Sequence, residues 1–206
     1  MISEVSLSVQ FRVLPKILEI EYLVTNRSNA NIYLVDLAAQ LKAEAITIRP
    51  ATIEVAVDPI KNEITLSSKM LPISSNVLYA VAPDVYTSAL QPGQVKKSMF
   101  TVPLPIKLTN EKEVKPESSI IQDVIKSTQP AAAKPAAPAQ RELNISKLIF
   151  VLGVISKEPG LKIEEQLIDD VAVSRMVVSE AIPHQKELKV DSIVSPAVQV
   201  IIEAPA

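Results

Sequence analysis

The residue types that carry most metal and acid–base chemistry are scarce in this sequence. Among 206 residues there is one histidine, His184, and there is no cysteine or tryptophan. A zinc site usually takes three or four Cys or His ligands, so the sequence predicts no metal site. A Ser-His-acid triad has only His184 to use, and its setting after Pro183 is typical of an exposed loop. We expect no cofactor, because Gly93, Gly153 and Gly160 lie too far apart to form a phosphate-binding loop.

Carboxylates are the remaining candidates for catalysis. The acidic pairs Glu164-Glu165 and Asp169-Asp170 could bind a hard cation. Neighbouring residues on a strand point to opposite faces, however, so neither pair closes on one ion by itself, and solvated positions are favoured. A hydrolase or carbohydrate-active protein that uses carboxylates such as Asp58, Asp84 or Asp169 stays an alternative, and it needs two carboxyl groups roughly 5 to 9.5 Å apart across a cleft. Ser-Lys dyads are formally possible, but these residues are too plentiful for such a pair to be specific.

The segment from Met70 to Gln91 is the main candidate for a protein interface. It has one charge, Asp84, in 22 residues, and it holds two of the four tyrosines. Tyrosine among apolar residues with few charges is the composition of an interface core. Three prolines argue against one long central strand here, and a connection packed over the end of the fold is the alternative. The candidate interface residues are Val77, Leu78, Tyr79, Val81, Val85 and Tyr86.

A second candidate lies in a segment of different composition, residues 110–142. Its Gln129–Gln140 part has three Pro and six Ala in twelve residues, which predicts a disordered, extended linker. Nearer the start of the 110–142 segment, Ser119 and Gln122 match a capping box at a short amphipathic pattern. We expect this segment to dock as a helix, or as an added edge strand, on a partner or on its own domain, through Ile120, Ile121, Val124 and Ile125.

The elements that must position these residues are mostly strands. Alternation with period two over 4–13 places Val5, Leu7, Val9, Phe11 and Val13 on one face, and the same pattern returns with Leu18, Ile20, Tyr22 and Val24. Further strands are expected at 32–37, 53–57, 64–70, 95–102, 148–155, 171–178, 187–194 and 198–203. The stretch 37–45 is rich in Ala and Leu and predicts a short helical turn or an irregular crossover. Residues 148–155, apolar on both faces, predict a central strand.

About nine or ten strands with little helix predict an all-β, antiparallel, immunoglobulin-like β-sandwich with a long Pro/Ala-rich insertion. Residues 1–109 and 143–206 would then complete one sandwich, since a piece of about 64 residues would leave a sheet face uncovered. A separate small β domain at 143–206 is the alternative. The hairpin of 18–25, Asn26-Arg27-Ser28-Asn29 and 32–34 resembles that of many bacterial immunoglobulin-like sandwiches, including Bacillus-type intracellular proteinase inhibitors. This resemblance implies the fold and keeps an inhibitor of an intracellular protease as a further alternative.

Charge and hydropathy narrow the function class. The net charge of −2 gives no basic face for nucleic acid. The longest strongly apolar run has eight residues against the roughly 20 that span a bilayer, and the N-terminus has no secretion-signal pattern. We therefore expect a cytoplasmic, non-enzymatic β-sandwich that binds another protein or a second copy of itself.

Overall fold

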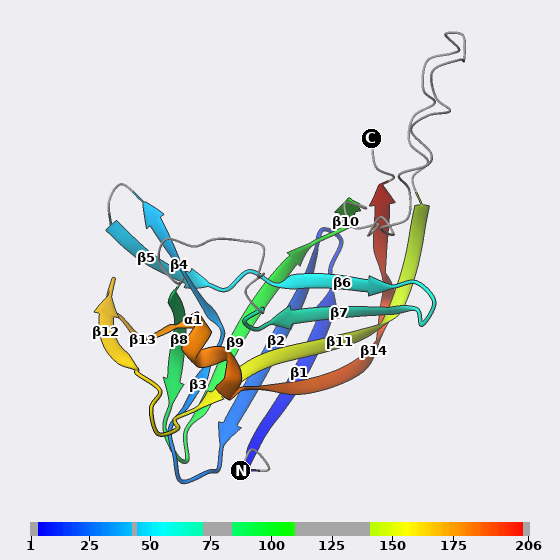
Figure 1. Ribbon diagram of the computed structural model, residues 1–206. Helices are drawn as coiled ribbons and strands as arrows, with labels where there is room; N and C mark the ends of the chain where they lie inside the picture. The colour runs from blue at the N-terminus through cyan, green and yellow to red at the C-terminus, as the bar shows by residue number, and fades with distance from the viewer. Residues whose placement is uncertain (1–3, 43–44, 72–83, 110–140, 204–206) are drawn as a thin grey trace, which may run out of the picture.

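The fold in the computed structural model is built almost entirely from strands (Figure 1). The structure describes residues 4–42, 45–71, 84–109 and 141–203. In these ranges there are fourteen strands, one four-residue helix, α1 (Val178–Ala181), and one 3-10 turn, η1 (Ile182–His184). The prediction of an all-β protein is confirmed.

The first sheet is antiparallel and has the order β1-β2-β9. Its strands are β1 (Val5–Val13), β2 (Ile17–Asn26) and β9 (Val95–Pro103). Leu18, Ile20 and Tyr22 of β2 are almost fully buried, whereas Leu23 on the opposite face is exposed. The inward and outward faces of β1 and β2 are therefore those predicted by the period-two pattern.

The second sheet has nine strands in the order β10-β14-β11-β3-β8-β13-β12, with β7 also pairing with β11 and β6 pairing with β7. Its members are β3 (Ile32–Leu34), β6 (Glu54–Asp58), β7 (Glu63–Ser68), β8 (Asp84–Leu90), β10 (Ile106–Thr109), β11 (Arg141–Ser156), β12 (Glu164–Ile168), β13 (Val171–Val177) and β14 (Gln185–Glu203). The long strand β11 is its centre. Residues 148–155 of β11 are all buried, which confirms the predicted central strand.

Several details of the expected architecture are wrong. Two strand pairs, β7 with β11 and β10 with β14, are parallel, so the second sheet is mixed rather than antiparallel. The stretch expected to be helical or irregular begins an antiparallel hairpin of β4 (Leu37–Lys42) and β5 (Ala45–Pro50). The strands predicted at 187–194 and 198–203 form one strand, β14. Because strand pairing rather than Ala and Leu propensity decides the local structure, the single-sequence prediction fails at 37–45.

One hydrophobic core lies between the two sheets. Tyr22, Phe100 and Phe150 form its centre, with ring centroids 5.4 to 6.0 Å apart in the three pairs. Aromatic pairs at these separations add about 0.5–1.5 kcal/mol each beyond their buried area. A second, smaller cluster includes Tyr33 and Met176 and packs around α1.

Strands from both sides of residues 110–140 contribute to the same sheet and core. β11 pairs with β3 and β7, and β10 pairs with β14. The main core contains Leu18 and Leu66 from the first part of the chain and Phe150 and Val198 from the last. β11 begins at Arg141, so the last two residues of the predicted linker, 141 and 142, belong to this strand. The predicted docking residues Ile120, Ile121, Val124 and Ile125 lie outside the described residues.

Candidate binding site

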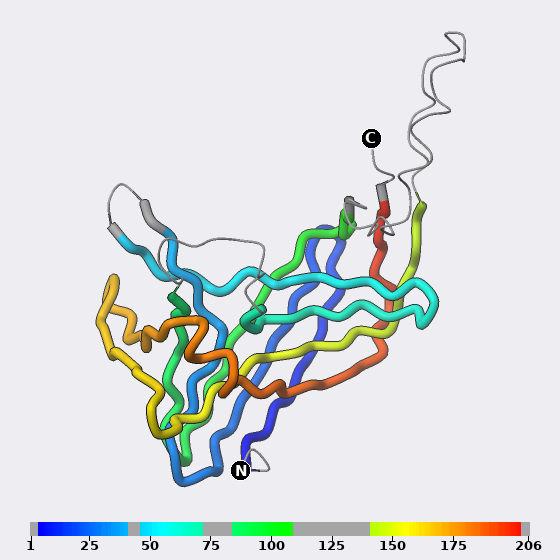
Figure 2. The backbone as a smooth tube through the Cα atoms, in the orientation of Figure 1, coloured from blue at the N-terminus to red at the C-terminus, as the bar shows by residue number. Residues whose placement is uncertain are grey.

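Three connections between strands gather at one end of the fold (Figures 1 and 2). They are residues 27–31 between β2 and β3, 91–94 between β8 and β9, and 157–163 between β11 and β12. We call these residues the loop end. The backbone N–H of Asn26 donates to the Gln94 carbonyl at 3.0 Å, and the Gly93 N–H donates to the Asn26 carbonyl at 2.7 Å. These two bonds fix the first two connections to each other.

The side chain of Asn26 organises the loop end from inside. It is fully buried, and its amide donates to the carbonyls of Leu90 and Ala30, both at 2.9 Å. Its Oδ1 accepts the backbone N–H of Ser28 at 3.0 Å and the Ser28 hydroxyl at 2.6 Å. Asparagine suits this position because it has both donors and acceptors to satisfy buried backbone groups. The polar turn recognised in the sequence is therefore tied to the neighbouring β8–β9 connection.

Two adjoining grooves open at the loop end. The lysine groove has a volume of about 330 Å³ and is lined by residues 28–32, residues 156–159 and Lys186. The glutamine groove has a volume of about 240 Å³ and is lined by Asn31, Ala89, Gln91, Gln94, Glu165, Gln166 and residues 172–174. Asn31 lines both grooves, so they lie next to each other. About half of the residues that line each groove have amide or charged side chains, and these suit a ligand with several hydrogen-bonding groups.

A polar cluster of a different kind is buried between the sheets. We call Tyr22, Asp36, Ser88 and Lys96 the Asp36 centre. Asp36 accepts the Tyr22 hydroxyl at 2.9 Å and the Ser88 hydroxyl at 2.8 Å, and its Oδ2 lies 2.7 Å from the Lys96 Nζ. Burial, and then the negative charge of Asp36, raises the pKa of Tyr22 far above its ordinary value. The phenol is therefore neutral and donates to the carboxylate.

The Asp36 centre contains a Ser-Lys pair, because the Lys96 ammonium donates to the Ser88 hydroxyl at 2.6 Å. That lysine is also paired with the Asp36 carboxylate, whose side chain is 1% exposed. An ammonium held by a buried carboxylate is no acceptor for the serine proton, and Ser88 is itself buried. The arrangement ties β2 and β9 of one sheet to β8 of the other, which is a structural role.

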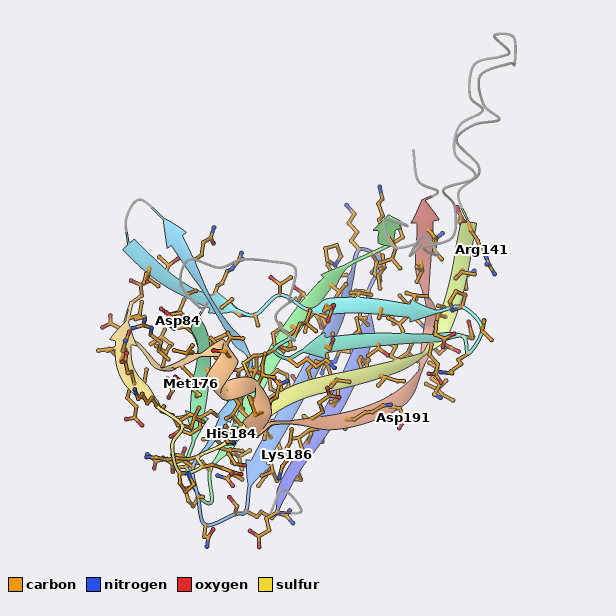
Figure 3. The ribbon with its side chains drawn as sticks, in the orientation of Figure 1. Asp84, Arg141, Met176, His184, Lys186 and Asp191 are labelled. Atoms are coloured by element: carbon orange, nitrogen blue, oxygen red, sulfur yellow. The ribbon has the colours of Figure 1, made fainter. Side chains whose placement is uncertain are left out.

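A third polar cluster lies on the β8–β13–β12 surface. The Arg175 guanidinium donates to Asp84 Oδ2 from Nε and from Nη2, each at 2.8 Å, and to Glu164 Oε2 at 3.1 Å. Hydrogen bonding to Asp84 is the main cause that raises the pKa of Arg175. The adjoining hollow has a volume of about 80 Å³. Asp84, which Figure 3 labels and which the sequence offers as a catalytic carboxylate, is thus paired with Arg175.

The other carboxylates singled out from the sequence lie in tight turns. Asp58 accepts the backbone N–H groups of Ile60 and Lys61, both at 3.0 Å, in the β6–β7 turn. These contacts, with that of Lys61 first, lower the pKa of Asp58. Asp169 and Asp170 form the β12–β13 turn with φ of 49° and 62°, the left-handed pattern of a two-residue hairpin turn. Asp58, Asp84 and Asp169 belong to three different local structures.

His184 lies in η1 at the start of β14 (Figure 3). Its Nδ1 is 3.8 Å from Glu158 Oε2, and its side chain is 29% exposed. The residue is therefore half-buried rather than fully exposed as the sequence predicts. Within the described part of the chain, no serine or threonine hydroxyl forms a hydrogen bond with His184.

The predicted interface is only partly described by the structure. Val77, Leu78, Tyr79 and Val81 lie outside the described residues. Val85 and Tyr86 lie in β8 and are 8% and 7% exposed. Val85 packs in the smaller core cluster with Met176. The interface therefore stays a prediction.

The sequence reasoning did not identify the grooves of the loop end. The signal that could have found them is the polar residues that follow successive strands, such as Asn29 and Gln94. Ranges 4–42, 45–71, 84–109 and 141–203 contain no group of three or more His, Cys, Asp or Glu able to hold a metal ion. Over the same ranges no helix has the length and apolar character needed to cross a membrane. Comparison with protein-family models, curated proteins and solved structures gives no match.

Proposed function

We propose that the protein is a non-enzymatic binding module that recognises a segment of another protein at its loop end. The observation that carries this proposal is the pair of adjoining grooves that share Asn31. Loops held by a rigid sheet scaffold are a common place for recognition, because the scaffold fixes their positions and their side chains are exposed to solvent. The grooves are lined by Gln91, Gln166 and Asn29, whose amides can donate to and accept from a peptide backbone.

In the other two polar clusters, the polar groups are already paired with one another, which favours a binding function over catalysis. The Asp36 centre is closed by internal hydrogen bonds, and Asp84 is held by Arg175. At the loop end, polar side chains line open grooves. A protein segment bound there gains hydrogen bonds without any chemical step, and the rigid β-sheet scaffold reduces the entropy cost of forming the site.

A peptide library displayed on phage tests this function. The wild-type protein is immobilised and selected against random peptides, and enriched peptides are then measured for binding in solution. Binding should fall strongly in N29A/Q166A, which removes one amide from each groove, and should stay unchanged in Q40A/Q199A, which removes two exposed glutamines elsewhere. Enrichment of peptides that bind both variants equally would reject the loop end as the site.

Self-association is the second form of the same proposal. Two copies could use either the loop end or the 70–91 stretch, whose exposed apolar residues include Leu71. Light scattering over a range of concentrations measures the mass directly. A monomer at all concentrations would leave only binding to a different protein.

We further propose that residues 1–109 and 143–206 form one immunoglobulin-like sandwich. This is supported by the shared core of Leu18, Leu66 and Phe150 and by the pairing of β11 with β3 and β7. Co-expression of residues 1–109 and 141–206 as two chains tests it. The two fragments should form one stable complex, and independent folding of the second fragment would favour a separate domain.

A further inference from the structure

The lysine groove has a distinct charge. Lys186 lies in β14, opposite Val154 of β11, and Lys157 follows the end of β11. Both side chains line the groove, and Figure 3 labels Lys186 next to η1. Over the described ranges five lysines form ion pairs, but Lys157 and Lys186 do not. Two positive charges therefore face one groove.

The remaining walls of the lysine groove suit a negatively charged ligand. Asn29 and Asn31 supply side-chain amide donors, and the backbone of 28–32 forms one side. Among the described residues the groove has one carboxylate, Glu158, whose Oε2 lies 3.8 Å from His184 Nδ1. The two lysines, Lys157 and Lys186, outnumber this carboxylate, so the positive charges exceed the negative one.

The neighbouring glutamine groove has the opposite charge. In the part of the chain that the structure describes, its one charged lining residue is Glu165. Its other polar lining residues are Asn31, Gln91, Gln94, Gln166 and Ser174. Acidic groups are therefore disfavoured there, whereas the backbone of an extended peptide can pair with the amides. The two grooves together form a site with a positive end and a weakly negative end.

We propose that the loop end binds an extended protein segment that places acidic side chains in the lysine groove and neutral or basic ones in the glutamine groove. This inference rests on the proposed function and adds the chemistry of the partner. A volume of about 330 Å³ lies at the small end of ligand sites, which run from about 300 to about 1,000 Å³, so it suits a short stretch of chain. Charge complementarity gives the direction in which the segment lies.

Fluorescence anisotropy with labelled peptides of equal length tests the proposal. The probes are a Gly-Glu repeat, a Gly-Gln repeat, a Gly-Lys repeat, and a peptide with Gly-Glu at one end and Gly-Lys at the other. The proteins are the wild type, K157Q/K186Q, and K16Q/K107Q as a control of equal net charge. Lys16 and Lys107 lie between β1 and β2 and in β10, at the end of the fold opposite to the loop end (Figure 1). Circular dichroism confirms that each variant is folded.

We expect the mixed-charge peptide to bind the wild-type protein most tightly and the Gly-Lys repeat to bind it most weakly. K157Q/K186Q should bind the mixed-charge peptide about tenfold more weakly, and K16Q/K107Q should match the wild type. Equal loss in both variants would overturn the inference, because the attraction would then be non-specific. Preference for the Gly-Gln or Gly-Lys repeat would overturn the acidic partner while leaving a peptide-binding site.

Inorganic phosphate is added as a competitor. Displacement of the peptide by phosphate at low concentration would overturn the protein segment in favour of a small-anion site. If no probe binds and the phage selection also enriches nothing, the proposed function itself fails. If the library yields binders that are neutral or basic, only the acidic partner is rejected.

Discussion

The Asp36 centre and the loop end are both rich in polar side chains, but they use them in opposite ways. In the Asp36 centre, the carboxylate is almost fully buried and accepts from Tyr22, Ser88 and Lys96. At the loop end, Asn29, Lys157 and Gln91 are exposed and line open grooves. A cluster of polar residues therefore marks a binding site only where its donors and acceptors are not already used by other groups of the protein.

Asn26 shares one property with each region. It is buried like Asp36, and its hydrogen bonds support the loop end. Its amide is used entirely within the protein, on Ala30, Leu90 and Ser28. The loop end is thus a solvent-facing surface supported by a buried polar residue. Substitutions should accordingly separate into those that change stability and those that change binding.

Lys96 and its neighbour Lys97 offer the largest contrast. Lys96→Met leaves the buried Asp36 carboxylate without its cation, so the free energy of unfolding should fall by about 3–5 kcal/mol. Lys97→Met removes an exposed pair with Glu21 and should cost under about 1 kcal/mol. Urea unfolding of both variants measures the difference. Equal effects would mean that the Asp36 centre is as solvent-screened as the surface.

Asn26→Ala should have the next largest effect. It removes the buried hydrogen bond to the Leu90 carbonyl, the part-buried one to the Ala30 carbonyl and the acceptor of the Ser28 N–H, so we expect a loss of about 2–3 kcal/mol. Asn29→Ala, three residues later and exposed, should stay within about 0.5 kcal/mol. NMR spectra should show shifts in the amides of 91–94, in the neighbouring connection, for Asn26→Ala only. Unchanged signals at 91–94 would show that the side chain of Asn26 does not contribute to holding the two connections together, beyond its backbone bonds to Gly93 and Gln94.

The sequence predicts the sheet faces well because side-chain alternation is a local property. The inward residues of β1 and β2 and the buried run 148–155 follow from period two and from apolarity alone. The parallel pairing of β7 with β11 and the merging of two predicted strands into β14 depend on partners far along the chain. Local pattern contains no information about strand direction, so these features could not be predicted.

The candidate site is harder to predict for the same reason. Asp36 lies 52 residues before Ser88 along the chain, and Asn26 lies 64 residues before Leu90. Lys96 and Lys97 are adjacent lysines, yet Lys96 is half-buried and Lys97 is exposed. Only the strand register, which places Lys96 opposite Val24 on the inner face, separates them. The residues of the site were visible as polar turns, but their convergence was not.

Tyr22→Phe should produce a smaller loss, about 1–1.5 kcal/mol, because Asp36 keeps Ser88 and Lys96. The raised pKa of Tyr22 also predicts a pH effect. Unfolded tyrosine ionises near about pH 10, whereas folded Tyr22 stays neutral, so its stabilisation is present below that pH and is lost as the pH rises above it.

Unfolding measured between about pH 8 and about pH 11 checks this sign. The loss of stability with rising pH should be shallower in Tyr22→Phe than in the wild type. Phenolate absorbance adds a second readout, since the folded wild type and the variant should titrate the same number of tyrosines. One fewer phenolate in the folded variant would show that Tyr22 ionises and would contradict the closed Asp36 centre.

The smallest effect on stability is expected at the loop end itself. K157Q/K186Q should change the free energy of unfolding by under about 0.5 kcal/mol, because both lysines are exposed and neither forms an ion pair within the described part of the chain. Urea unfolding beside K16Q/K107Q measures this. A fall in the free energy of unfolding as large as that of Asn26→Ala would contradict a binding role, because the lysines would then support the fold rather than face a ligand. Retained stability with weakened binding of the mixed-charge peptide would assign recognition to the loop end and rigidity to the Asp36 centre.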